Sequence, residues 1–202
     1  MVKVLADECQ EEVKNTDLDL VLRCQSGDRA AFRELYRRYH KRIRSTLYQL
    51  CGEYLLEDLL QEVFLRAWKG LPKLRQPEHF PTWIYRITWN VATDRRRELA
   101  KMANFRLKND ESNQEEQLLN KRASRPQDCP DLMRLHYEDL IRRGLDRLRL
   151  EHRIVIVLHD LEDLSQKEVA NILNVPVGTI KSRLFYARKS LEKYLKNQGV
   201  SL

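Results

Sequence analysis

The sequence predicts an all-α protein made of two small helical domains joined by a flexible linker, the second with a helix-turn-helix. Apolar residues recur at helical spacing over long segments, and no segment shows the strict alternation of a half-buried strand. The 202 residues include only 6 glycines and 6 prolines, so few positions interrupt a helix. Residues 102–130 lose the amphipathic period and become polar and acidic, which is typical of a linker.

The first domain is expected over residues 16–101, after a flexible N-terminus at 1–15 that is polar and has little periodicity. Its first helix is short. Thr16 or Asp17 can cap the start of this helix, and Gly27 lies where it ends.

Two longer helices follow, one from the capping residue Asp28 to Gly52 and one from Leu55 to Leu71. Each has an apolar stripe at helical spacing, and the outer side of the first is strongly basic. The residues predicted to be buried are Phe32, Leu35, Tyr36, Tyr39, Ile43, Leu47 and Leu50 in the first, and Leu56, Leu59, Leu60, Val63, Phe64, Ala67 and Trp68 in the second.

The outer face of the helix at 55–71 is acidic, with Glu57, Asp58, Gln61 and Glu62. A solvated face is the usual explanation, and carboxylates early in a helix also favour the positive end of its dipole. The alternative is a docking face for a basic partner, because complementary charge steers encounter and fixes register. The residues alone leave both interpretations open.

The proline-containing segment 72–81 predicts an ordered loop, and a helix is expected from 82 to 101. In that helix aromatic rings alternate with cations, which suits single-stranded DNA because bases stack on rings while phosphates meet arginines. The side chains concerned are Trp83, Tyr85, Arg86, Trp89, Asn90, Thr93, Asp94, Arg95, Arg96 and Arg97. The alternative is that the apolar members, Trp83 among them, pack the domain.

The second domain is expected over residues 131–198 and closes with the helix-turn-helix at 165–191. Ser165 and Glu168 form a capping box, and Asn174 followed by Pro176 ends the first helix. The second helix leaves a basic, hydrogen-bonding face off its buried stripe. That face carries Lys181, Ser182, Arg183, Tyr186, Arg188 and Lys189. An ordinary helical hairpin with a solvated basic face is the alternative.

A formal net charge of +7 with 33% charged residues suits a protein that meets a polyanion. No apolar run reaches about 18 residues and no N-terminal signal is present, so we expect a cytoplasmic protein without direct membrane insertion. The cysteines and histidines are scattered. We therefore expect no metal site, no catalytic residues, no cofactor and no enzyme activity.

Three segments together resemble bacterial extracytoplasmic-function (group 4) sigma factors of RNA polymerase. They are DLLQEVFLRAW at 58–68, FPTWIYRITWNVATDRRR at 80–97 and LSQKEVANILNVPVGTIKSRLFYARKSL at 164–191, in the order and spacing of that family. The resemblance implies a sigma factor that directs promoter recognition, DNA melting and transcription initiation. It covers roughly residues 17–195.

The resemblance also implies roles for individual residues. A coiled coil of the largest polymerase subunit would be bound by Asp58, Gln61 and Glu62, which favours the docking interpretation of the acidic face. The minus-ten element would be captured, melted and read by Arg75, His79, Phe80, Trp83, Arg86, Trp89, Asn90, Asp94, Arg95 and Arg96. The minus-thirty-five element would be contacted by Thr179, Lys181, Ser182, Arg183, Tyr186 and Arg188.

The partners implied are core RNA polymerase, through its coiled coil and flap, promoter DNA in duplex and single-stranded form, and an anti-sigma factor. The acidic linker residues Asp110, Glu111, Glu115 and Glu116 could imitate nucleic acid inside the polymerase. The rival is a helix-turn-helix transcriptional regulator that is not a polymerase subunit. It leaves the acidic face and the aromatic, basic helix unexplained.

Overall fold

The computed structural model describes residues 16–109 and 130–200, and in these two ranges every regular element is a helix. The first part contains α2 (Asp17–Gln25), α3 (Arg29–Cys51), α4 (Leu56–Gly70), two 3-10 turns, η1 (Leu71–Lys73) and η2 (Pro77–His79), and α5 (Phe80–Asn109). The second contains α6 (Pro130–Asp146), α7 (Leu150–Ile156), the π-helical η3 (Val157–Leu161), α8 (Gln166–Leu173) and α9 (Val177–Asn197). The predicted flexible segment 1–15, the four acidic linker residues, Cys9 and Cys129 lie outside the described residues.

The predicted starts of α2 and α3 are confirmed. Thr16 Oγ1 accepts a hydrogen bond from the Asp19 amide at 3.2 Å, and Asp28 Oδ1 accepts one from the Ala30 amide at 2.7 Å. Each side chain thus satisfies a backbone N–H that has no partner within the helix. Gly52 ends α3 with φ +77°, a conformation that glycine adopts at no steric cost.

The expected bounds of α5 are wrong at both ends. The helix begins at Phe80 because proline is tolerated in a first turn, where its missing N–H would have no partner, so Pro81 starts the helix instead of preventing it. It continues past Lys101 to Asn109, into the segment expected to be linker. Two residues of the predicted buried stripes are also exposed, Tyr36 by 40% and Trp68 by 37%.

The first part packs α2, α3, α4 and α5 around fully buried residues such as Ile43, Val63 and Ile84. The second packs α6 to α9 around residues such as Val155 and Ile180.

Close packing in the second part depends on Gly144 of α6. A Cβ added there would lie 2.5 Å from Leu191 Cδ1 and 2.9 Å from the Tyr194 ring, so α9 approaches α6 at this point because no side chain intervenes.

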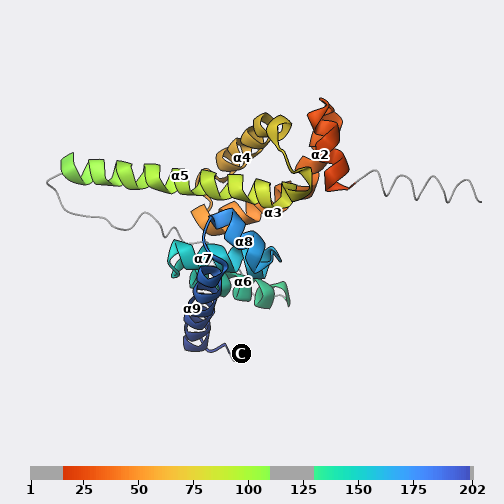
Figure 1. Ribbon diagram of the computed structural model, residues 1–202. Coiled ribbons are helices and arrows are strands. Elements are labelled where there is room, and N and C mark those ends of the chain that lie inside the picture. The colour runs from red at the N-terminus through yellow and green to blue at the C-terminus, as the bar shows by residue number, and fades with distance from the viewer. Residues whose placement is uncertain (1–15, 110–129, 201–202) are drawn as a thin grey trace, which may run out of the picture.

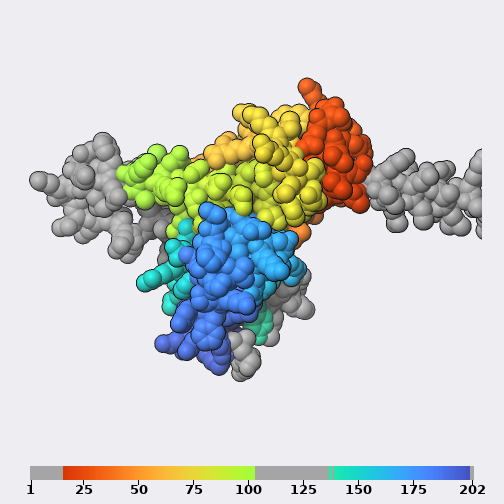
Figure 2. Space-filling view, in the orientation of Figure 1, coloured from red at the N-terminus to blue at the C-terminus, as the bar shows by residue number. Residues whose placement is uncertain are grey.

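The two parts touch. Helix α8 lies against α5, and the α6, α7 and η3 region lies against α3 (Figure 1). Helix α4 lies on the opposite side of α5 from the second part, at the upper edge in Figure 1. The space-filling view shows the second part seated directly beneath α5 (Figure 2).

Candidate functional site

Helix α4, which carries the acidic face, lies on the opposite side of α5 from the second part of the molecule (Figure 1). Asp58 and Gln61 are exposed, and Glu62 is half-buried with its carboxylate 2.7 Å from Arg66 Nε. The N-cap residue Leu55 has φ +58° and supplies no side-chain cap, so the carboxylates of Glu57 and Asp58 in the first turn also stabilise the helix start. A helix-stabilising role and a docking role are therefore both physically available to this face.

The loop and helix expected to meet the minus-ten element form one continuous stretch along η2 and α5. Arg75 and His79 are exposed in the loop, and Arg86, Asn90 and Arg96 are exposed on the helix. The remaining predicted contacts on α5 are half-buried: Trp83, Trp89, Asp94 and Arg95.

Phe80 does not belong to this surface. It is 1% exposed, and its ring lies 5.3 Å from the Tyr39 ring and 5.9 Å from the Trp83 ring, measured between centroids. A direct contact between Phe80 and DNA is therefore contradicted, because the ring is part of the hydrophobic core. The sequence did not reveal this because Phe80 was assigned to a loop, whereas it is the first residue of α5.

Several cations of α5 are already engaged within the protein. Arg86 donates to the backbone carbonyl of Asn171 in α8, and Arg96 donates to the carbonyl of Leu50 at 3.2 Å. Arg95 lies 3.1 Å from Glu98. In this conformation part of the predicted strand-reading surface is thus held by protein acceptors.

The helix-turn-helix forms as predicted. The Glu168 amide donates to Ser165 Oγ at 3.3 Å and the Ser165 amide to Glu168 Oε2 at 2.8 Å, which completes the capping box. Asn174 adopts the left-handed conformation, with φ 53° and ψ 50°, and ends α8. Ala170 and Ile180 are buried where α8 and α9 cross.

The outer face of α9 carries the predicted duplex contacts. Lys181, Ser182, Tyr186 and Arg188 are exposed, whereas Thr179 and Arg183 are half-buried. Both arginines are paired with carboxylates of α7 and η3. Arg183 lies 3.0 Å from Glu151, and Arg188 forms two hydrogen bonds with Asp160, at 2.5 and 3.0 Å, which raise the pKa of its guanidinium.

The sequence reasoning missed Phe185. It is 61% exposed on α9, and its ring meets the Tyr186 ring edge-to-face at 5.4 Å. An apolar ring on a DNA-facing helix can contact the methyl group of thymine. The available signal was its position outside the buried stripe of Ile180, Leu184 and Ala187.

In the described residues no helix is long and apolar enough to cross a bilayer, and no group of three or more His, Cys, Asp and Glu side chains is arranged to hold a metal ion.

The protein has an exposed basic helix-turn-helix in its second part and a helix rich in arginine and tryptophan, α5, in its first. These two surfaces together define a DNA-binding protein that acts in transcription. The families described as Sigma-70 region 2 and Sigma-70, region 4 match residues 35–102 and 138–191. The chain is 32% identical over 183 residues to the ECF RNA polymerase sigma-E factor of Escherichia coli K12, covering 88% of this chain and 93% of that protein. The corresponding factor of Haemophilus influenzae is 29% identical over 191 residues, covering 90% and 96%.

Two solved structures share the fold. CnrH in complex with the cytosolic domain of CnrY has a TM-score of 0.63 at 24% identity, covering 90% of this chain and 97% of that one. The sigma factor RpoE of Bartonella quintana in complex with the anti-sigma factor NepR has a TM-score of 0.61 at 22% identity, covering 82% and 96%. The chain belongs to the extracytoplasmic-function sigma factors, and it is an alternative sigma factor of RNA polymerase.

Proposed function

We propose that this sigma factor divides its work among three surfaces: the acidic face of α4 docks on core polymerase, α5 melts and reads the minus-ten element, and α9 reads the minus-thirty-five element. The observation that carries this proposal is the exposure of the acidic residue Asp58 and of Gln61 on α4, a helix distinct from both α5 and α9. Binding to DNA alone gives these exposed acidic side chains no partner, whereas docking on a basic surface of polymerase does.

The docking surface consists of Asp58, Gln61 and Glu62, which bind the coiled coil of the largest polymerase subunit. Asp58 is exposed and Glu62 is held by Arg66. Opposite charges on the two partners speed their encounter and fix their relative register. The second domain would add a contact with the polymerase flap.

Strand opening depends on the exposed part of α5 and its loop, namely Arg75, His79, Arg86, Asn90 and Arg96. A flipped base costs a few kcal/mol of unstacking, which contacts in a pocket and along a basic helix offset without nucleotide hydrolysis. Trp83 and Trp89 are half-buried and present only part of their rings to a base. The chain itself catalyses no reaction.

Duplex recognition uses the exposed face of α9. Basic side chains contact phosphates and set the register, and base edges are read by the polar and apolar side chains that enter the major groove. To the predicted set we add Phe185 as a contact for thymine methyl groups.

The protein acts in the cytoplasm, where its polymerase lies, and is held inactive by an anti-sigma factor. The support for such a partner is the two structures of similar fold, one of a sigma factor bound to an anti-sigma factor and one bound to a cytosolic domain.

The test is reconstituted transcription with core polymerase and promoter DNA selected by the holoenzyme. Core polymerase with this protein should start transcription at one position, and core alone should not. Equal transcription without the protein, or specific binding to the selected duplex without any need for core, would favour a free-standing regulator instead.

A further inference from the structure

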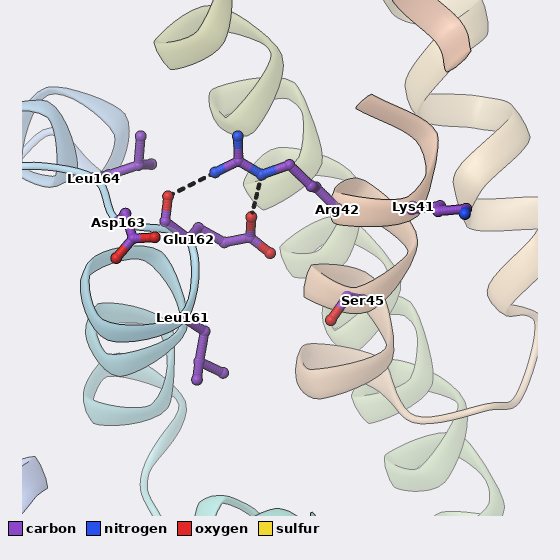
Figure 3. A pocket seen from close by; sticks show the side chains of 7 residues that line it. All are labelled: Lys41, Arg42, Ser45, Leu161, Glu162, Asp163 and Leu164. Atoms are coloured by element: carbon purple, nitrogen blue, oxygen red, sulfur yellow. Dashed lines mark hydrogen bonds and ion pairs between the residues drawn. The ribbon is translucent and has the colours of Figure 1, made fainter. Parts of the chain in front are cut away.

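A buried carboxylate joins the two domains. Glu162, in the turn between η3 and α8, is only 6% exposed although its side chain ends in a carboxyl group. Its side chain accepts hydrogen bonds from Arg42 Nε at 2.8 Å, Tyr85 Oη at 2.6 Å and Thr46 Oγ1 at 3.2 Å. Its backbone carbonyl accepts a further bond from Arg42 at 2.7 Å (Figure 3).

All three partners of the Glu162 side chain belong to the first domain. Arg42 and Thr46 come from α3 and Tyr85 from α5. Burial raises the pKa of the Tyr85 hydroxyl, so this group stays protonated and donates to the carboxylate. The donors to the Glu162 carboxylate thus all lie in the other domain.

Two further hydrogen bonds cross the interface between the two domains, which is called the seam below. Arg153, 9% exposed in α7, donates to the carbonyl of Gln49 at the end of α3 at 3.2 Å. Arg86 of α5 donates to the carbonyl of Asn171 in α8. These hydrogen bonds lie beside apolar contacts, since the buried apolar residues of the two domains form one connected cluster. An open pocket lined by Lys41 and Asp163 among others gives solvent access to the edge of the seam (Figure 3).

While the two domains are in contact, α5 and α9 cannot bind the minus-ten and minus-thirty-five elements at the same time. The minus-ten and minus-thirty-five positions are separated by about 25 base pairs, roughly 85 Å of B-DNA. Arg86 touches Asn171, and residues 171 to 177 span at most about 22 Å of extended chain. The DNA-facing part of α9 adds about 16 Å, so its far end lies within about 40 Å of the α5 surface.

We propose that Glu162 with Arg42, Thr46 and Tyr85 forms an interdomain clasp that holds the free sigma factor in a closed state, which must open before α5 and α9 can engage a promoter together. This inference rests on the proposed function. Helix α4 lies on the opposite side of α5 from the second domain, so core polymerase can dock on the closed protein (Figure 1). Its contact with the second domain through the flap then favours the open state, because that contact depends on where the second domain lies.

The chemistry of the clasp suits a releasable contact. A buried charge must be paired and hydrogen-bonded, which makes the closed pose specific. Desolvation of Glu162 offsets much of its attraction to Arg42, which stays about half exposed, and the carboxylate is rehydrated when the domains separate. The net free energy of the clasp itself is therefore modest.

The test measures domain separation in the free, full-length protein, with Cys9→Ser and Cys129→Ser to remove two native thiols, by energy transfer between dyes on Tyr54→Cys and Lys193→Cys, one exposed position in each domain. Glu162→Ala should raise the ratio of open to closed molecules at least about tenfold, because the closed state loses three hydrogen bonds to a charged group. The matched control is Asp163→Asn. This change removes the neighbouring exposed charge and keeps a residue that tolerates φ +58°, so the ratio should not change.

Two more variants show whether opening comes from loss of the clasp or from misfolding of one domain. Arg42→Ala should open the protein as Glu162→Ala does, and the double variant should open it little further than each single change, since both remove one interaction. Helical circular dichroism should match the wild type in all of them. An unchanged open fraction in Glu162→Ala, or an equal effect of Asp163→Asn, overturns the clasp.

A transcription assay distinguishes failure of the clasp from failure of the proposed function. With core polymerase and a cognate promoter, Glu162→Ala should reach half-maximal open-complex formation at a lower concentration of sigma factor than the wild type does. A protein that opens as expected but needs the same concentration overturns the claim that closure limits promoter engagement. Loss of all promoter-dependent transcription, in wild type and variant alike, overturns the proposed function while the measured clasp stands.

Discussion

Arg66 of α4 lies 3.2 Å from the carboxylate of Asp94 in α5. The same guanidinium lies 2.7 Å from Glu62, so one cation connects a predicted polymerase-docking residue with a predicted minus-ten residue. All three side chains are between 43% and 49% exposed, and surface pairs of this kind contribute only about 0–1 kcal/mol. The connection can therefore rearrange when polymerase or DNA competes for either carboxylate.

The docking role of α4 is best tested at Asp58, because reversing Glu62 would also release Arg66. Asp58→Arg should weaken binding to core polymerase about tenfold by placing a positive charge against a basic partner. Titration of labelled protein with core measures the effect. The control Glu57→Arg changes the neighbouring charge, which faces Arg44 at 2.9 Å, and should have little effect. Unchanged affinity in Asp58→Arg would remove this face from the docking surface.

Asn90 offers a test of strand reading, because its side chain is exposed on α5. Asn90→Ala should weaken binding of the holoenzyme to a single-stranded minus-ten oligonucleotide roughly fivefold, the equivalent of about 1 kcal/mol for one hydrogen bond. The same change should leave thermal stability as it is. Asn197→Ala, at the end of α9, serves as the control. A loss confined to duplex binding would assign Asn90 to a different role.

Two phenylalanines, one in the core and one on the surface, should respond differently to replacement by alanine. Phe80→Ala should lower the free energy of unfolding by about 3–5 kcal/mol, since a buried ring leaves a cavity. Phe185→Ala should change it by less than about 0.5 kcal/mol, because that ring is 61% exposed, and should instead weaken binding to duplex DNA. Urea denaturation measures both. Equal stability of the two variants would contradict the burial of Phe80.

Arg183 must leave Glu151 in order to contact DNA. Arg183→Ala should weaken minus-thirty-five binding, and if the contact is to a phosphate the slope of log affinity against log salt should fall by about one. Glu151→Gln should do the opposite and strengthen binding, because it frees the arginine and removes a repelling charge. Opening of a pre-melted bubble should respond little to either change. Lys193→Ala, an exposed cation further along α9, is the control.

The described cysteines should react slowly with thiol reagents. Burial raises the pKa of Cys24 to about 11 and that of Cys51 above its usual value. At pH 8 the nucleophilic thiolate of Cys24 is therefore scarce, and its labelling rate should rise about tenfold per pH unit toward pH 11. The experiment uses Cys9→Ser with Cys129→Ser. Fast labelling at pH 8 without denaturant would be incompatible with this prediction.

Much of the secondary structure follows from local chemistry. Asp28, Ser165 with Glu168, Asn174 and Gly52 each act on backbone groups within about four residues, so their effect is visible in the sequence and the structure confirms it. The predicted stripes were mostly right for the same reason. The errors, Tyr36 and Trp68, fall at stripe edges, where a helix period does not tell how far a neighbouring helix covers a ring.

The sequence by itself determined the all-α class, the caps, the helix-turn-helix and the charge of each face, because these depend on neighbours along the chain. Only the tertiary structure decided that Phe80 is core, that Arg183 and Arg188 are paired with carboxylates, and that Glu162 lies against Arg42 and Tyr85. Those contacts join residues far apart in the sequence. Whether a charge or a ring meets solvent or protein depends on how separate helices pack, and no local pattern records it.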